Sequence, residues 1–269
     1  MNTKIIVIKI GGSTLGQHDT TLQDLVELQK RGTSVVVIHG GGKIITEWLG
    51  KLSSSSEFVQ GERVTDKTGL EVATAVLAGV VNKDLVANLN ALGAKAIGIS
   101  GVDGCLLTAI VKNPALGYVG NIEKVNTGLL ITLLEAGYIP VISSVSYNPA
   151  VKPGSGPLLL NVNADVAAGE IAAVLGAEKL VFLTDIAGVC DKDGQVITTL
   201  NIQESEALIA SGVATKGMIP KIRSGIRAAA ATGTARIIDG RRPHALLNEI
   251  ESSPGGTTIY GKSSEVKNG

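Results

Sequence analysis

Residues 158–175 read LLLNVNADVAAGEIAAVL, and the interpretation of the whole chain starts from this stretch. The apolar run at 158–160 is typical of a buried strand, and the Ala-rich segment from Ala164 to Leu175 is typical of a helix. Between them stand Asn161, Asn163 and Asp165. Polar side chains at such a junction suit a binding site, although Asn163 or Asp165 alone is also explained as a helix cap. A helix cap explains only one of these three polar residues, so the junction is better explained as a ligand-binding site.

The same alternation of strand and helix runs along most of the chain. Apolar, β-branched runs such as Ile5–Ile10, Ser34–Ile38 and Lys179–Leu183 alternate with segments of helical spacing. Aromatic residues make up only 3% of the 269 residues, so the core consists of aliphatic side chains, as in parallel sheets covered by helices. The sequence predicts an α/β fold, in one large domain or two lobes.

Composition argues against several classes of protein. Apolar residues make up 44% and charged residues 18%, as in a folded globular chain. Lys plus Arg equals Asp plus Glu, 24 against 24, which gives no reason to expect nucleic-acid or acidic-membrane binding. Cys105 and Cys190 form no metal-ligand pattern. No apolar stretch reaches the ~20 residues of a membrane span, and no cleavable leader precedes the first strand, so we expect a soluble cytoplasmic protein.

Two strand ends carry features that suit an anionic ligand. Lys9 lies at the end of the first strand and is followed by Gly11-Gly12; a buried lysine needs a partner, whereas a lysine at an edge only extends to water. The second strand ends in His39-Gly40-Gly41-Gly42 before a helical pattern. A glycine turn into a helix presents backbone N–H groups to an anion. The turn matches neither a Walker loop nor a Rossmann fingerprint.

Further polar residues stand at predicted turns. Arg63, in a predicted hairpin over 58–65, suits bidentate binding of a carboxylate, with a solvated surface arginine as the alternative. Lys221 follows Pro220 in the first turn of a predicted helix, where a cation opposes the helix dipole, so we expect an anionic partner there. Residues 66–92 are predicted to be helical, with a kink or break near Gly79 and Asn82.

Six short motifs occur in order along the chain. They are Lys9-Ile10-Gly11-Gly12, His39-Gly40-Gly41-Gly42, Gly61-Glu62-Arg63-Val64-Thr65, Asn161-Val162-Asn163-Ala164-Asp165, Leu183-Thr184-Asp185 and Gly217-Met218-Ile219-Pro220-Lys221. Together they resemble the amino acid kinase family over residues 4 to about 260. The resemblance implies a three-layer α/β/α sandwich with a central, mostly parallel eight-stranded sheet. It also implies an N-terminal lobe, 1–178, for the acyl amino acid and dimerisation, and a C-terminal lobe, 179–269, for ATP.

The resemblance also implies roles for individual residues. Lys9 and Lys221 would be catalytic and hold the transferring phosphoryl group, while Asp165 would organise both lysines. The implied substrate-binding residues are Gly41, Gly42, Arg63, Asn161 and Asn163. The implied nucleotide-binding residues are Gly11, Gly12, Thr184, Asp185, Gly188, Val189, Val213, Thr215, Gly217 and Met218.

The implied reaction is phosphorylation of the side-chain carboxylate of N-acetyl-L-glutamate by ATP, the second step of arginine biosynthesis. Mg²⁺ would sit on the ATP phosphates without a protein metal site. The carboxylate is already a nucleophile, so none of the three histidines is needed as a base. Two alternatives remain: a kinase for aminoadipate or glutamate on a carrier protein, and a non-catalytic sensor, which loss of Lys9, Asp165 or Lys221 would mark.

Oligomeric state and regulation give conflicting signals. Arginine-inhibited members of the family carry an extra N-terminal helix, whereas the first strand here begins near residue 4, which favours a homodimer without arginine control over a hexamer. Against this, His244, Glu249 and Gly256-Thr257 resemble the inhibitor-binding stretch of the sensitive members.

Overall fold

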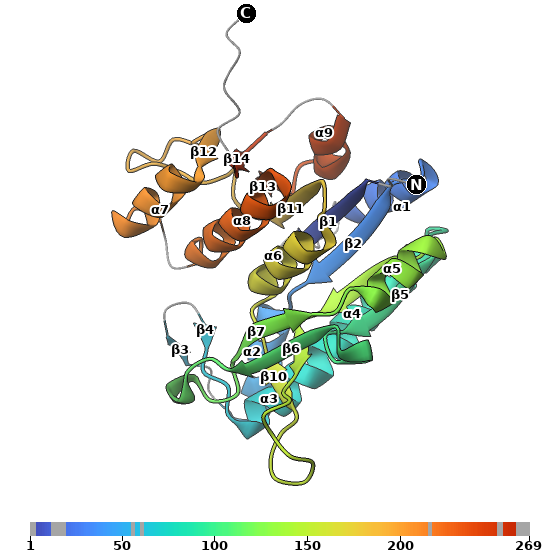
Figure 1. Cartoon of the computed structure of the whole chain (residues 1–269), viewed down its shortest axis with the longest axis vertical. Coiled ribbons are helices and arrows are strands. Elements are labelled where there is room, and N and C mark those ends of the chain that lie inside the picture. The colour runs from blue at the N-terminus through green and yellow to red at the C-terminus, as the bar shows by residue number, and fades with distance from the viewer. Residues whose placement is uncertain are drawn as a thin grey trace, which may run out of the picture.

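An eight-stranded sheet forms the centre of the molecule (Figure 1). The computed structural model describes residues 4–11, 20–54, 57–59, 62–214, 217–251 and 255–261. Within this part, β13 and β14 run antiparallel and the other neighbouring strands are parallel, as predicted. The strand order is β12 (Thr199–Asn201), β14 (Thr257–Tyr260), β13 (Thr234–Asp239), β11 (Lys179–Thr184), β1 (Ile5–Ile10), β2 (Ser34–His39), β8 (Ile139–Ser143) and β5 (Ala96–Ser100).

Helices cover both faces of the sheet, which gives the three expected layers (Figure 1). Strand β1 shows why: Val7 packs into one apolar cluster, while Ile6 and Ile8 pack into another on the opposite face. The first face carries α5 (Gly128–Glu135), α6 (Ala164–Leu175), α7 (Ile202–Ala210) and α8 (Ile219–Thr232). The second carries α1 (Thr21–Lys30), α2 (Gly42–Lys51), α3 (Lys67–Thr74), α4 (Asn82–Ala91) and α9 (Ala245–Glu251).

Helices α6 and α8 approach each other closely at Gly169. A Cβ atom on this glycine would lie 2.9 Å from both the Cβ and the carbonyl oxygen of Ser224. Real Cβ atoms do not come this close to backbone, so only glycine allows the two helices to touch here. The contact lies about one helical turn beyond Asp165 on α6 and Lys221 on α8.

Two smaller sheets lie beside the central one. The four-stranded sheet has the order β10 (Leu159–Asn161), β9 (Val145–Tyr147), β6 (Leu107–Val111) and β7 (Gly120–Val125). The hairpin comprises β3 (Phe58–Val59) and β4 (Glu62–Arg63), and single 3₁₀ turns are η2 (Asp103–Cys105) and η3 (Pro114–Leu116). The apolar run over 138–145 predicts a single strand, and this prediction is wrong, because β8 ends at Ser143 and β9 begins at Val145 in a different sheet.

The helical segment over 66–92 has no break. It passes from α3 through the π-helix η1 (Ala75–Val81) directly into α4. In a π-helix each backbone hydrogen bond spans one residue more than in an α-helix, so the helix continues with a wider turn. The alternative of a break near Gly79 and Asn82 is therefore wrong, whereas a kink stays a prediction, since π-helical turns are common causes of kinks.

The central sheet divides between β1 and β11. One half, from β1 to β5, comes from residues 5–143, and the other half, from β11 to β12, comes from residues 179–260. The two strands pair within one continuous sheet, and both the lobe boundary between residues 178 and 179 and the roles of the two lobes stay predictions. None of the helices in the described ranges is long and apolar enough to cross a membrane.

Candidate active site

The carboxyl ends of the parallel strands meet at one edge of the sheet, where ligands of open α/β proteins bind. Lys9 lies near this end of β1 and alternates onto the same face as Val7, toward α6. Asp165 occupies the first turn of α6, and Lys221 the first turn of α8. Three separate elements therefore bring the three predicted catalytic residues to one place.

Asp165 is buried and forms one ion pair with each of the two lysines. Its Oδ1 lies 2.9 Å from Nζ of Lys9, and its Oδ2 lies 2.8 Å from Nζ of Lys221. The Lys221 contact is a hydrogen bond, whereas Oδ1 accepts no well-aligned hydrogen bond in the described structure and is balanced by charge alone. The side chains of Lys9 and Asp165 are 8% and 7% exposed, against 18% for Lys221. The lysine from α8 is thus the more open of the two.

The electrostatics favour an ionised carboxylate. Burial by itself would raise the pKa of Asp165, but the positive charges of Lys9 and Lys221 and the hydrogen bond from Lys221 outweigh burial and hold the pKa below its ordinary value. Two positive charges around one negative charge leave a net positive site. Such a site suits an anionic ligand.

The cap of α6 is Asn163. Its side-chain oxygen accepts from the backbone N–H groups of Asp165 and Val166. The interpretation of Asp165 as a cap was therefore wrong, and Asp165 gains instead from the positive end of the helix dipole. The anionic partner expected for Lys221 is present within the protein as Asp165.

The predicted substrate-binding residues form a second group beside the glycine turn. Arg63, 8% exposed, donates from Nη2 to the carbonyl oxygen of Gly42 at 2.9 Å and to Oγ1 of Thr46 at 2.8 Å. Its guanidinium lies over the Phe58 ring, 4.7 Å from the ring centre. Burial lowers the pKa of Arg63. Gly41 is buried and Gly42 begins α2.

Thr65 joins this group to the opening motif. Nδ2 of Asn161 donates to Oγ1 of Thr65 at 3.2 Å, and Thr65 in turn donates to the carbonyl oxygen of Arg63 at 2.9 Å. Thr65 is fully buried. Arg63 and Asn161, which lie far apart in the sequence, are thus brought together, as their assignment to one substrate requires.

The predicted nucleotide-binding residues are less uniform. Gly11 and Thr184 lie at the carboxyl ends of β1 and β11, and the N–H of Gly11 donates to the carbonyl oxygen of Leu183. Val189 is 1% exposed and its N–H donates to Oγ1 of Thr257, so this group is already engaged within the protein. Other members are the exposed Asp185 and Gly217, the half-buried Val213, and the buried Gly188 and Met218. Gly12 and Thr215 lie outside the described residues.

Two polar residues at this edge were missed in the sequence. His39, at the end of β2, and Asn82, at the start of α4, are both buried and lie 3.1 Å apart between Nε2 and Nδ2. A signal was present, because Asn82 is a polar residue among the apolar positions Val81 and Leu85 of the helical pattern. A buried amide needs hydrogen-bond partners.

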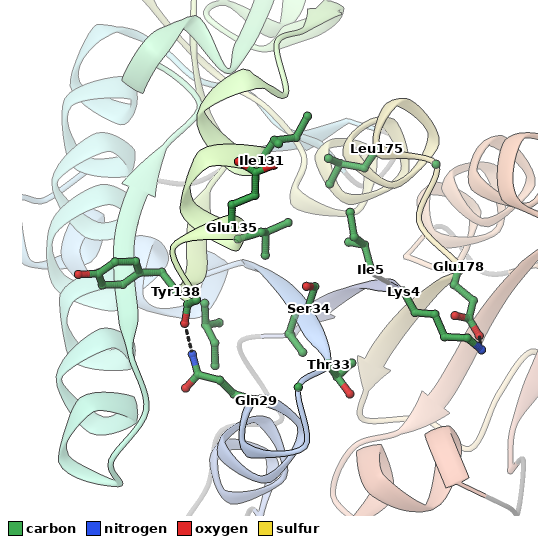
Figure 2. A pocket seen from close by; sticks show the side chains of 16 residues that line it. Lys4, Ile5, Gln29, Thr33, Ser34, Ile131, Glu135, Tyr138, Leu175 and Glu178 are labelled. Atoms are coloured by element: carbon green, nitrogen blue, oxygen red, sulfur yellow. Dashed lines mark hydrogen bonds and ion pairs between the residues drawn. The ribbon is translucent and has the colours of Figure 1, made fainter. Parts of the chain in front are cut away.

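A pocket of about 920 Å³ lies at the opposite edge of the sheet, near the starts of β1 and β2 (Figure 2). Figure 2 shows Lys4 paired with Glu178, and the Gln29 amide bonded to the carbonyl of Gly137. Because it lacks the lysine pair, this pocket is not the candidate active site. In the part of the chain that the structure describes, no group of three or more His, Cys, Asp or Glu is placed to hold a metal ion.

His244 and Glu249, which resemble part of an inhibitor-binding stretch, both have partners within the protein. Glu249 forms an ion pair at 2.7 Å with Arg236, and Nδ1 of His244 lies 2.7 Å from Asp24. A cavity of about 540 Å³ is lined in part by Glu249 and Gly256. The expected absence of arginine control stays a prediction.

Fold and site together define a doubly wound α/β protein with a lysine pair that suits an anionic ligand at the carboxyl edge of its sheet. The model of the amino acid kinase family matches residues 4–239. The chain therefore belongs to the amino acid kinase family, which confirms the resemblance drawn from its motifs.

Individual relatives agree with this assignment. An acetylglutamate kinase of Dehalococcoides mccartyi is 46% identical over 258 residues, covering 96% of this chain and 95% of the relative. The crystal structure of smu.665 from Streptococcus mutans superposes with a TM-score of 0.82 at 28% identity, covering 96% of this chain and 99% of the other. N-acetylglutamate synthase of Neisseria gonorrhoeae, in complex with coenzyme A and N-acetyl-glutamate, gives a TM-score of 0.82 at 27% identity and covers 97% of this chain and 60% of the synthase.

Proposed function

We propose that this protein transfers the γ-phosphoryl group of ATP to the side-chain carboxylate of N-acetyl-L-glutamate. A bond forms between a carboxylate oxygen and the γ-phosphorus, and the bond from that phosphorus to the β,γ-bridging oxygen breaks. The products are N-acetyl-L-glutamyl 5-phosphate and ADP. The attacking oxygen carries no proton, so the step needs no general base.

The lysine–aspartate–lysine arrangement is the observation that carries this proposal. Phosphoryl transfer depends on positioning and on positive charge where negative charge spreads. Lys9 and Lys221 supply two compact positive charges, and Asp165 sets their separation through contacts of 2.9 and 2.8 Å. Lys9 comes from strand β1 and Lys221 from helix α8, which precedes β13 in the other half of the chain, so the pair suits a group that passes from one ligand to another.

The other contacts assign the two ends of the reaction. Arg63 and Asn161, joined through Thr65, support a site for the carboxylate of the acyl amino acid. The glycine turn at Gly41 and Gly42 contributes backbone N–H groups near the reacting atoms. ATP would enter as its Mg²⁺ complex on the side of β11 and α8. We expect a cytoplasmic homodimer, with the dimer contacts in the N-terminal lobe.

Formation of the acyl phosphate tests the proposal. Purified protein with ATP, Mg²⁺ and N-acetyl-L-glutamate should produce ADP and a product that hydroxylamine traps as the hydroxamate. N-acetyl-L-aspartate and free L-glutamate serve as matched controls, because the first shortens the side chain and the second restores the charged amine. Both should react at least about tenfold more slowly, since a missing methylene or an unpaired charge costs over a kilocalorie per mole.

Three outcomes separate the alternatives. Turnover of N-acetyl-L-glutamate above both controls supports the proposal. Binding of ATP without any turnover would indicate a sensor. Turnover that requires a carrier-bound substrate would move the chain to the other kinase class within the family.

A further inference from the structure

Asn82 is a buried amide that reaches from α4 to the carboxyl edge of the sheet. Its Nδ2 lies 2.9 Å from the carbonyl oxygen of Val141 on β8 and 3.1 Å from Nε2 of His39 on β2. Its side-chain oxygen accepts from Nζ of Lys83 at 3.1 Å. A Cβ on Gly98 of strand β5 would lie 2.0 Å from this oxygen, so the strand has a glycine where the amide rests.

These contacts define the protonation of His39. A backbone carbonyl only accepts hydrogen bonds, so the atom of Asn82 that faces Val141 is the amide nitrogen, a donor. The same nitrogen lies 3.1 Å from Nε2 of His39 and 3.3 Å from the carbonyl oxygen of Ile99, and of these two acceptors the ring nitrogen is the nearer. The proton of the ring therefore lies on Nδ1, which donates to the carbonyl oxygen of Gly40 at 3.0 Å.

The environment also keeps this ring neutral. His39 is 1% exposed, and burial lowers its pKa to about 4. The bond to the Gly40 carbonyl raises the pKa, and the positive charges of Lys9 and Lys83 lower it. At neutral pH the ring therefore adds no further charge beside Lys9.

The Gly40 carbonyl controls the direction of the next backbone N–H. The N–H of Gly40 donates to the carbonyl oxygen of Ile10 on the neighbouring strand at 3.2 Å, and its carbonyl accepts from His39. The peptide bond is planar, so the Gly40 carbonyl and the Gly41 N–H turn together. From Gly41 the chain enters α2, whose first N–H groups have no acceptor within the helix.

We propose that His39 and Asn82 are positioning residues for the phosphoryl transfer: together they fix the Gly40 carbonyl and so aim the first N–H groups of α2 at the transferring group. The proposal rests on the function proposed above for the same site. Asn82 holds the ring in the Nδ1–H form, and the ring holds the turn. Neither side chain needs to touch a substrate.

Two substitutions at position 39 separate this role from packing. In His39→Asn the amide nitrogen takes the place of Nδ1 and still donates to Gly40, whereas in His39→Gln the amide takes the place of Nε2 and only the contact with Asn82 remains. We expect kcat of His39→Gln to fall between about tenfold and a hundredfold, the range of a misplaced catalytic group, with KM for ATP within about twofold. His39→Asn should keep kcat within about threefold. Equal kcat in both variants, or a larger loss in His39→Asn, would overturn the proposal.

A matched pair on α4 tests the partner. In Asn82→Asp the carboxylate accepts from His39 instead of donating, which draws a proton to Nε2. Asn90→Asp makes the same chemical change on the same helix, where the side chain binds the backbone of Ala96 and not His39. We expect the first variant to lose at least about tenfold in kcat and the second to stay within about twofold. Similar losses in both would overturn the role of Asn82.

The protonation state of the His39 ring can be measured independently of enzyme activity. Nitrogen NMR of histidine-labelled wild-type protein should show His39 neutral and protonated at Nδ1 from pH 5.5 to 8, and protonated at Nε2 in Asn82→Asp. An imidazolium, or an Nε2–H ring, in the wild type at pH 7 would overturn the proposal. This spectrum is independent of whether N-acetyl-L-glutamate is the substrate, which turnover by the wild type decides separately.

Discussion

Among the residues that the structure describes, Asp165 and Glu249 are buried carboxylates that each have two cationic partners, and the two clusters differ in the kind of cation. Asp165 lies between Lys9 and Lys221, with the Lys221 side chain 18% exposed. Glu249 binds Arg236 through both carboxylate oxygens and lies 3.4 Å from Lys179. The Arg236 and Glu249 side chains are 5% and 1% exposed.

We interpret the lysine cluster as the proposed catalytic site and the arginine cluster as a structural one. Arg236 is a planar fork that also donates to the carbonyl of Gly255, so the cluster joins β13, α9 and the chain before β14. A lysine ammonium is a compact charge on a flexible stem, able to turn toward a ligand while one partner stays in place. Lysines around Asp165 suit chemistry, whereas the arginine around Glu249 suits stability.

The largest expected effect lies in the structural cluster. Glu249→Gln leaves Arg236 buried without a compensating charge, and arginine cannot release its proton. We expect the free energy of unfolding to fall by about 3–5 kcal/mol, with kcat of the folded protein unchanged. Urea unfolding and initial rates at low temperature measure the two quantities. A stable variant with lost activity would reverse the assignment of the two clusters.

The lysine cluster should show the opposite pattern. Lys9→Ala or Lys221→Ala removes charge stabilisation of the transferring group, so kcat should fall about a hundredfold to a thousandfold, or ~2.7–4 kcal/mol, while the circular dichroism spectrum stays that of the folded wild type. Lys179→Ala is the control, because it removes a lysine beside a buried carboxylate far from the glycine turns. Near-normal turnover in Lys9→Ala or Lys221→Ala would remove these lysines from catalysis.

Arg63 extends the comparison to an arginine that we propose binds the substrate. Arg63→Ala should raise KM for N-acetyl-L-glutamate about tenfold to a hundredfold, because a hydrogen bond to a charged group contributes ~1.5–3 kcal/mol, and should leave KM for ATP unchanged. Steady-state kinetics with each substrate varied gives both values. Arg227→Ala, which removes an exposed pair with Glu170, is the control, and equal KM values in the two variants would exclude Arg63 from the substrate site.

The smallest effect is a dependence of stability on pH. The pKa of Asp165 is depressed in the folded protein, so its stabilising contribution is present above the ordinary carboxylate pKa of about 3.9 and is lost as pH falls through the folded value. The difference in urea midpoint between wild type and Asp165→Asn should therefore shrink from pH 6 to pH 3. The pKa of Asp239 is also depressed, by hydrogen bonds from Arg241, but it contributes equally to both proteins. A constant difference across this range would contradict the assignment.

The sequence predicted the elements with a strong hydrophobic pattern. It failed for elements whose structure depends on the strand or helix that they contact. Strands β1, β2 and β11 were found because a β-branched run buried on both faces is distinctive. β12 was missed, because three residues at an edge carry no pattern. The split between β8 and β9 was missed too, because an apolar run does not indicate which sheet each half joins.

The site divides in the same way. Lys9, Asp165 and Lys221 were singled out because charges at strand and helix ends are unusual; the structure brings the three side chains together, and their catalytic roles stay predictions. The pairing of His39 with Asn82 was missed because it depends on the register of η1, a widening that brings Asn82 over β2 and β8. Val189 is the opposite case: the resemblance implies that it binds the nucleotide, but its N–H donates to Oγ1 of Thr257 within the protein.

The close approach of α6 and α8 at Gly169 sets the distance between Asp165 and Lys221. The backbones of α6 and α8 touch there, about one turn from the carboxylate and the ammonium that they carry. A single methyl group at position 169 would wedge the helices apart and lengthen the 2.8 Å contact without altering any charged residue. The turnover rate can therefore depend on a small residue in the contact between two helices as well as on the charged residues themselves.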